Sequence, residues 1–404
     1  MSTVAHESTP DPELWIGAPS ATVPDDVDDA VLIGRVWDPA AGGPSVVVVR
    51  EGELLDLTAH FATVRDLCEH DDPATVARGV TGPSLGTVDD IVRNTASARR
   101  GPGKPWMLAP VDLQALKAAG VTFAASMVER VIEERARGDQ LEAARIRAEL
   151  LGASVGTDLS RVTPGSAEAA LIKESLSARG LWSQYLEVGI GPDAELFTKG
   201  QVLSAVGTAS AVGILESSSW NNPEPEIALI VQSSGRTVGA TLANDVNHRD
   251  IEGRSALLLG RAKDNNASCA LGPFIRLFDD AFTMEHVRRL TVHLDIRGAD
   301  GFHLADASPM REISRDPDSL VDQLIGSHHQ YPDGAVLMLG TMFAPVADRD
   351  IVGEGFTHRV GDVVTISTPM LGSLVNVVDH SENCAPWTFG ARDLMANLAG
   401  RNLL

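Results

Sequence analysis

The stretch that decides the fold is PEPEIALIV, residues 223–231. It places Glu224 and Glu226 two residues apart at the start of an apolar run. Residues two apart on a β-strand point to the same face of the sheet. The stretch therefore predicts a buried strand that carries two carboxylates on one face.

Two further polar residues extend this pattern along the chain. Asp245, in TLANDVNHRD, follows Glu226 by 19 residues, and Lys263, in GRAKDNNASCALGPF, follows Asp245 by 18 residues. Three carboxylates without Cys or His suit a hard cation, Mg²⁺ first and Mn²⁺ or Ca²⁺ as alternatives. We predict Glu224, Glu226 and Asp245 as metal ligands and Lys263 as a proton carrier. A solvated strand edge with a turn Asp is the alternative for the three acids alone.

The composition limits the class of protein. The chain has 33 basic and 55 acidic residues and a net charge of −22. Such a surface repels nucleic acid and anionic membranes, so we expect neither as a partner. No apolar run approaches the roughly 20 residues that span a bilayer, and the polar N-terminus does not resemble a signal peptide. Three Cys are too few for a disulfide framework. We expect a cytoplasmic enzyme with a small-molecule substrate.

The apolar pattern predicts two domains. Residues 1–108 form a small N-terminal β-rich domain, with strands over 31–56, a helix near 62–68 and a Gly-, Pro- and Arg-rich linker over 82–105. Residues 109–404 form the catalytic domain. Helical periodicity marks about 124–180, with a cap at Ser166 or Pro164, and strand patterns dominate after 184. Without βαβ alternation the fold class is α+β, mainly β.

Several motifs in this order resemble the fumarylacetoacetate hydrolase family. PEPEIALIV resembles its E-x-E metal strand, and NDVNHRD resembles the segment of its third metal carboxylate, with Arg249 following. Lys263 before LGPF resembles its active-site Lys, and GPDAELFTKG (191–200) resembles its F-x-K strand. GTMFAP is similar to its Gly-Thr turn, here Gly340 and Thr341. The resemblance implies a mixed β-roll catalytic domain, a divalent metal and a homodimer or homotetramer.

Within this family, the phrases GLWSQYLEVGIGPDAE, WNNPEPE, HQYPDG and PWTFG are similar to bacterial sugar-acid dehydratases. This similarity implies a hydro-lyase that converts 2-keto-3-deoxy-D-xylonate to 2,5-dioxopentanoate and water in pentose catabolism, as in D-xylose degradation. The direction of the C4 hydroxyl, derived from D-xylonate or from L-arabinonate, stays open.

One departure from the family pattern bears on the reaction. Hydrolases of the family often carry G-x-N-Y-x-x-H-x-x-E, and the corresponding stretch here is GVTFAASMVE, residues 120–129. Ser126 replaces the His, whereas Glu129 is kept. A Ser needs its own base to deprotonate water near neutral pH, whereas a His does not. This disfavours the alternative function, a C–C hydrolase or decarboxylase of acylpyruvate-like diketo acids.

The expected reaction assigns roles to the remaining candidates. Lys263 would be the base at C3, with its pKa lowered by the metal and by burial. Glu195 would protonate the departing C4 hydroxyl, and Glu129 would be a further catalytic residue. The substrate-binding candidates are Arg249, Thr341, Gly340 and Ser126.

Each role has a plainer alternative. Lys263 could pair with Asp264 at the surface, and Arg249 could pair with Asp250 or Glu252. Glu129 lies on a charged helix where arginines three or four residues away are ordinary partners. The helices of 126–180 could also form a lid over the cleft.

Overall fold

The structure is a computed structural model of the chain. It describes residues 22–96, 100–137, 139, 141–143, 145–146, 162–178, 182–343, 348–349 and 355–404. The side chains of 125, 126, 128 and 133 are outside the description. The predicted N-terminal arm and part of the predicted helix over 126–152 therefore lie outside the described residues.

The main sheet has eleven strands among the described residues. In spatial order these are β4 (Ser84–Thr87), β3 (Glu53–Asp56), β2 (Gly43–Arg50), β1 (Leu32–Asp38), β13 (Cys269–Leu277), β11 (Thr237–Asp245), β10 (Pro225–Val231), β16 (Ala335–Met338), β6 (Ala115–Gly120) and β7 (Glu195–Gly200), with β5 (Trp106–Met107) paired to β1. All pairs are antiparallel except β16 with β6, which is parallel.

A second sheet packs against the first. Its strands, in spatial order, are β15 (His303–Pro309), β14 (Thr291–Arg297), β17 (Val363–Thr368), β18 (Gly372–His380) and β8 (Ser210–Ile214). A small pair joins β9 (Asn221–Asn222) to β12 (Asn247–His248). Two large sheets with helices outside them confirm the predicted α+β, mainly β class.

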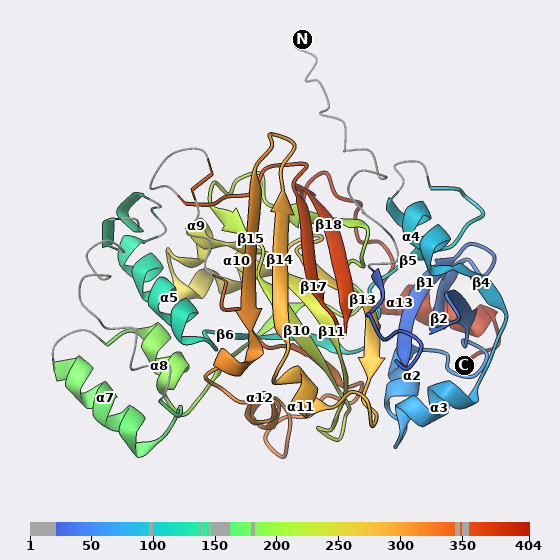
Figure 1. Cartoon of the computed structure of the whole chain (residues 1–404), viewed down its shortest axis with the longest axis horizontal. Helices are drawn as coiled ribbons and strands as arrows, with labels where there is room; N and C mark the ends of the chain where they lie inside the picture. Colours follow the sequence, from blue (N-terminus) through green and yellow to red (C-terminus); the bar gives the residue numbers. More distant parts are fainter. Residues whose placement is uncertain are drawn as a thin grey trace, which may run out of the picture.

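The helices lie around the sheets. In chain order they are α2 (Val64–Cys68), α3 (Pro73–Gly79), α4 (Val88–Ala96), α5 (Ala124–Ala136), α7 (Ala167–Ala178), α8 (Gln184–Ile190), α9 (Arg249–Glu252), α10 (Leu259–Lys263), α11 (Met284–Val287), α12 (Pro317–Leu324) and α13 (Ala391–Gly400), with the 3₁₀ turns η3 (Ala256–Leu258) and η4 (Met310–Glu312). Figure 1 shows α5, α7 and α8 together at one end and α2, α3 and α4 at the other. None of the described helices combines the length and apolar character needed to cross a bilayer.

The strand β10 is buried on both faces, which explains its unbroken apolar sequence. Leu229 packs in a cluster with Leu294 of β14 and Ile366 of β17. The next residue, Ile230, points the other way and packs in a cluster with Leu67 of α2. In Figure 1 the second sheet lies in front of β10 and β11. The apolar runs that predict strands after residue 184 include 227–234, 236–243, 335–341 and 362–378. They overlap β10, β11, β16 and the hairpin of β17 and β18, which confirms them as strands.

The N-terminal strands continue the main sheet. β1 pairs with β13, so residues 32–56 and 269–277 share one hydrogen-bonded sheet. The boundary near residue 108 stays a prediction. The linker predicted over 82–105 was wrong for 84–96, which form β4 and α4. Val88, Ile91, Val92 and Thr95 are buried at helical spacing, and the surrounding Gly and Pro concealed that pattern.

The predicted helices before residue 190 are observed in the described part. α2 falls within the predicted 62–68, and α5 covers the first turns of the helical segment. The backbone N–H of Ala169 donates to Oγ of Ser166 at 3.1 Å, which confirms Ser166 as the cap of α7.

The buried Asp112 fastens α2 to the main sheet, and this contact is testable. Its carboxylate accepts hydrogen bonds from the backbone N–H of Val64 at 2.6 Å and Arg65 at 3.1 Å, and it lies 3.9 Å from Arg35 of β1. We expect Asp112→Ala to lower the free energy of unfolding by about 3 kcal/mol, because it leaves buried donors and a buried cation without their partner.

Urea denaturation measures this loss. The control is Asp333→Ala, which removes an exposed pair with Arg65 and should cost less than about 1 kcal/mol. Equal small losses in both variants would contradict the role of Asp112.

Candidate metal and active site

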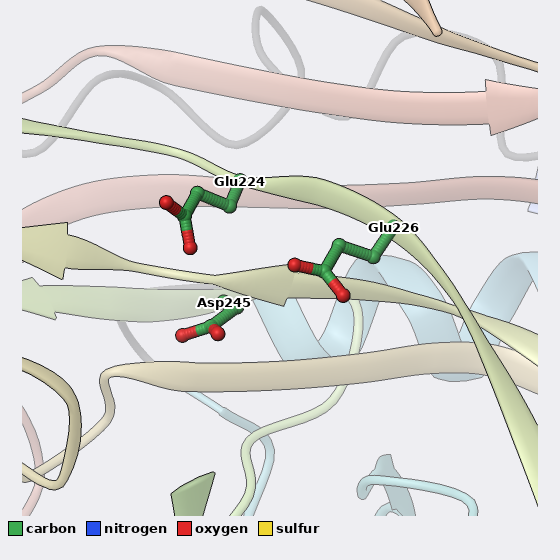
Figure 2. A group of neighbouring side chains, drawn as sticks. All are labelled: Glu224, Glu226 and Asp245. Atoms are coloured by element: carbon green, nitrogen blue, oxygen red, sulfur yellow. The ribbon is translucent and has the colours of Figure 1, made fainter. Parts of the chain in front are cut away.

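Three carboxylates converge where β10 and β11 lie side by side. Glu224 directly precedes β10, Glu226 lies within it, and Asp245 ends β11. All three are buried, and one oxygen of each lies within 4.8 Å of the others. Figure 2 shows the three side chains pointing into the same space. The antiparallel register places Glu226 opposite Ala243 and so brings Asp245 near Glu224. The predicted same-face placement of the two glutamates is therefore seen.

Each of these carboxylates has one oxygen held by a donor of the protein. Oε1 of Glu224 accepts from Arg130 at 2.6 Å and from Asn247 at 3.1 Å. Oε2 of Glu226 accepts from the backbone N–H of Gly340 at 2.6 Å, and Oδ1 of Asp245 lies 2.7 Å from Nζ of Lys199. One oxygen of each carboxylate is thereby oriented, and the second oxygens of Glu224 and Asp245 contact the ammonium of Lys263.

Lys263 fills the position of a cation. Its ammonium donates to Oε2 of Glu224 and lies 3.2 Å from Oδ2 of Asp245, and it stands over the ring of Phe197. Burial alone would lower the pKa of Lys263, but the charges of Asp245 and Glu224 outweigh it and raise the pKa above its usual range. The lowered pKa expected from the sequence is therefore not found in this arrangement, because it required the charge of a bound metal.

The donor set fits a hard divalent cation. Burial, with the charges of Asp245 and Glu224, raises the pKa of Glu226 well above its ordinary value. Burial also raises the pKa of Glu224. A cation among the three oxygens would relieve this repulsion, and the triad contains oxygen donors alone. Glu224, Glu226 and Asp245 could thus hold such an ion.

The triad opens into a pocket that collects most of the predicted site residues. Among the described residues, those that line it include Glu129, Glu195, Arg249, Lys263, Gly340 and Thr341 beside the three acids. The side chain of Ser126 lies outside the described residues. The surface position considered for Lys263 is excluded, since it is 2% exposed.

Glu195 begins β7 and pairs with Gly120 of β6. A Cβ on residue 120 would lie 2.0 Å from Oε2 of Glu195, so a larger residue there would displace this carboxyl. Burial and the neighbouring carboxylate of Glu252 raise the pKa of Glu195 to about 7. Near neutral pH, about half of the molecules therefore carry a proton on Glu195, as an acid for a leaving hydroxyl requires.

The remaining candidates lie around the rim of the triad. Arg249 is buried, lies 3.7 Å from Glu129 and stacks over Trp220 at 4.6 Å. Arg249 thus forms an ion pair with Glu129 of α5. Gly340 has a φ of +86°, and a Cβ there would lie 2.1 Å from Oγ1 of Thr122. That turn requires glycine and aims its N–H at Glu226.

The sequence did not single out three charged residues of this site. Arg130 and Glu252 both line the pocket, and Lys199 is buried behind Asp245. In the sequence, Lys199 is marked only as the Lys of the F-x-K strand. Arg130 was read as an ordinary partner on a helix surface, and Glu252 as a partner of Arg249. No short-range signal marks the Arg130–Glu252 pair, whose members are 122 residues apart.

His248 is a structural residue rather than a ligand. Its Nδ1 lies 2.6 Å from the carbonyl of Ala262, and its Nε2 accepts the backbone N–H of Leu215 at 2.9 Å. Burial lowers the pKa of His248 to about 4, so the ring is neutral. His328 and His329 are exposed and do not line the pocket.

The fold and this site define a β-rich domain with a buried carboxylate centre. Residues 190–379 match the family model for the fumarylacetoacetate (FAA) hydrolase C-terminal domain, so this part of the chain is similar to that family.

Two curated relatives match the chain in part. A Haloferax volcanii protein named probable 2-keto-3-deoxyxylonate dehydratase is 30% identical over 194 residues, which are 48% of this chain and 63% of that protein. A Saccharolobus solfataricus 2-dehydro-3-deoxy-D-arabinonate dehydratase is 28% identical over 184 residues, 46% of this chain and 58% of that protein. The match therefore spans less than two thirds of either relative.

Solved structures share the fold. A 2-keto-3-deoxy-D-arabinonate dehydratase complexed with magnesium and 2,5-dioxopentanoate has a TM-score of 0.58 at 19% identity, over 86% of this chain and 99% of that chain. A 5-carboxymethyl-2-hydroxymuconate delta-isomerase from Mycobacterium smegmatis has a TM-score of 0.50 at 17% identity, over 86% and 98%. Proteins with different named activities share this fold, so the reaction must be argued from the site.

The triad yields a prediction about cation binding. We expect Glu226→Gln to weaken Mg²⁺ affinity by roughly 100-fold or more, because a ligand charge is lost. The unfolding temperature in chelator should be equal or higher, since the substitution removes a buried like charge and keeps an acceptor for the N–H of Gly340. Calorimetric Mg²⁺ titration and thermal unfolding measure both effects.

The matched control is Glu53→Gln, at an exposed position of β3. It should keep the Mg²⁺ affinity of the wild type. Unchanged Mg²⁺ binding by Glu226→Gln would contradict the assignment of the triad.

Proposed function

We propose that this protein is a divalent-cation-dependent dehydratase that converts 2-keto-3-deoxy-D-xylonate to 2,5-dioxopentanoate and water. The observation that carries the proposal is that a buried carboxylate triad and a half-protonated carboxyl, Glu195, share one pocket. The names of the two curated relatives support the substrate class. A cytoplasmic location, a role in pentose catabolism and a homodimer or homotetramer are part of the same proposal.

Glu224, Glu226 and Asp245 would hold the cation, with Mg²⁺ proposed first and Mn²⁺ or Ca²⁺ as alternatives. When bound, the ion would polarise the keto and carboxylate oxygens of a 2-keto acid and so acidify the hydrogens on C3. It would also take the oxygens that now hold the Lys263 ammonium. The attraction that raises the pKa of Lys263 would then be reduced.

The two candidate proton carriers have complementary tasks. Lys263 would remove a proton from C3, and the hydroxyl would leave C4 with a proton from Glu195, as water. The C3–C4 double bond formed in this way lies next to the C2 ketone. Loss of a C5 proton and protonation of C3 then move the double bond to C4–C5 and give an enol. Loss of the enol O–H proton and protonation of C4 convert this enol to the aldehyde of 2,5-dioxopentanoate. No oxidant is required, because the reaction is an elimination followed by tautomerisation.

The charge of the pocket suits an anionic substrate with a divalent ion. Six carboxyl groups and four basic side chains surround it among the described residues: Glu129, Glu195, Glu224, Glu226, Asp245 and Glu252 against Arg130, Lys199, Arg249 and Lys263. With Glu195 protonated, five carboxylates, four basic side chains and a divalent ion give the pocket a net charge of +1. The single carboxylate of the substrate would balance this charge. Arg249, Thr341, Gly340 and Ser126 are the proposed substrate-binding residues, and Glu129 is a further proposed catalytic residue beside Arg249.

Turnover of defined keto acids tests the function. With Mg²⁺, the protein should form 2,5-dioxopentanoate from 2-keto-3-deoxy-D-xylonate, measured through NAD(P)H by a coupled dioxopentanoate dehydrogenase. Chelator should abolish the rate, and added Mg²⁺ should restore it. The epimer derived from L-arabinonate and a 1,3-diketo acid serve as comparison substrates. Cleavage of the diketo acid without turnover of either pentonate would instead establish the alternative C–C hydrolase or decarboxylase.

The pH dependence tests Glu195 as the acid. A proton donor with a pKa of about 7 loses its proton as the pH rises through that value, so kcat should fall on the alkaline side. A bound cation shifts this fall to lower pH. Glu195→Gln should remove that limb and lower kcat by about 10²- to 10⁴-fold.

Glu312→Gln, at an exposed position, is the control and should keep the rate and the profile of the wild type. A Glu195→Gln protein that keeps the alkaline limb would show that another group donates the proton.

A further inference from the structure

Arg130 reaches from α5 into the pocket and bridges two carboxylates. Its two Nη atoms donate to Oε1 of Glu224 and Oε2 of Glu252, each at 2.6 Å. The two carboxylate side chains are 7% and 6% exposed. A planar guanidinium can hold two carboxylates in fixed positions, which a single ammonium cannot do. Arg130 therefore joins α5 both to a proposed metal ligand and to α9.

A second ion pair joins the same two helices with the charges reversed. Glu129 of α5 lies 3.7 Å from Arg249 of α9. Arg249 stacks over Trp220, which packs in a small cluster with Ile132 of α5. On α5 the acid Glu129 directly precedes the base Arg130. On α9 the base Arg249 lies three residues before the acid Glu252. Only one placement of α5 satisfies both pairs, so the pairs specify its position over the pocket.

The apolar side chains of α5 are mainly committed to the helical segment. Met127 and Val131 pack in a cluster with Tyr185, Leu186 and Ile190 of α8. This cluster is separate from the clusters that fill the sheets. Figure 1 shows α5 and α8 together at one side of the two sheets. Among the described contacts, those of Arg130 join this segment directly to a proposed metal ligand.

We infer that Arg130 is a positioning residue that couples the place of α5 to cation binding. The inference rests on the proposed cation site. Arg130 and Asn247 hold Oε1 of Glu224, whereas Oε2 contacts the Lys263 ammonium, whose place a cation would take. A cation on Oε2 orients the carboxylate for Arg130, and Arg130 orients it for the cation. Because such coupling is reciprocal, each strengthens the other by the same factor.

The substitution Arg130→Lys separates geometry from charge. It keeps the positive charge and removes the fork that spans both carboxylates. We expect Mg²⁺ affinity, measured by calorimetry with the metal alone, to fall about 10-fold. In the wild type, Mg²⁺ should slow amide hydrogen exchange in α5, and this response should be lost in the variant. Arg135→Lys, at an exposed position of the same helix, is the matched control and should behave as the wild type.

Three results would refute the proposal, each for a different reason. Wild-type Mg²⁺ affinity together with a wild-type exchange response in Arg130→Lys would overturn the coupling. Faster exchange in α5 by the same factor with and without Mg²⁺, at unchanged affinity, would show a merely structural role. Absence of Mg²⁺ binding by the wild type would refute the cation site itself and, with it, the proposed function.

Discussion

The interaction on which the rest of the site depends is the repulsion among three buried carboxylates. Like charges at this separation are costly away from water. Burial, together with the charges of Asp245 and Glu224, therefore raises the pKa of Glu226 well above its ordinary value. The fold tolerates the arrangement because the donors around it are rigid. A backbone N–H from a turn that only glycine can form holds Glu226, and a buried lysine holds Asp245. The two packed sheets provide the backbone that keeps these groups together.

This constraint also explains why the site gathers cations from distant parts of the chain. Lys199 comes from β7, Lys263 ends α10 and Arg130 comes from α5. Each supplies a positive charge to the acids, yet the described pocket still has more carboxyl groups than basic side chains. When every acid is charged, the negative charges exceed the positive charges by two, which a divalent cation would balance. Burial, together with the charge of Glu252, raises the pKa of the Glu195 carboxyl to about 7, so the same pocket prepares both a cation site and a proton donor.

Local patterns predicted much of the fold but only part of the site. The strands β10, β11, β16, β17 and β18 and the cap Ser166 could be predicted because continuous or alternating apolar runs and helix capping are short-range patterns. α4 was missed because Gly and Pro on both sides concealed its four buried residues. The contacts of Arg130 with Glu224 and Glu252 span 94 and 122 residues, and no periodicity carries such information. The domain boundary near 108 remains a prediction, although β1 and β13 share a sheet.

The sequence by itself determined which chemistry is available. A Glu-x-Glu spacing on an apolar strand places two carboxylates on one face, and the order of Asp245, Lys263 and the Gly-Thr turn marks the family domain. Tertiary structure decided how those groups behave. It placed the half-buried Glu195 near Glu252, set Lys263 between two acids and brought α5 over the triad. Protonation and orientation depend on neighbours brought close by packing, because electrostatic interactions act through space and not along the chain.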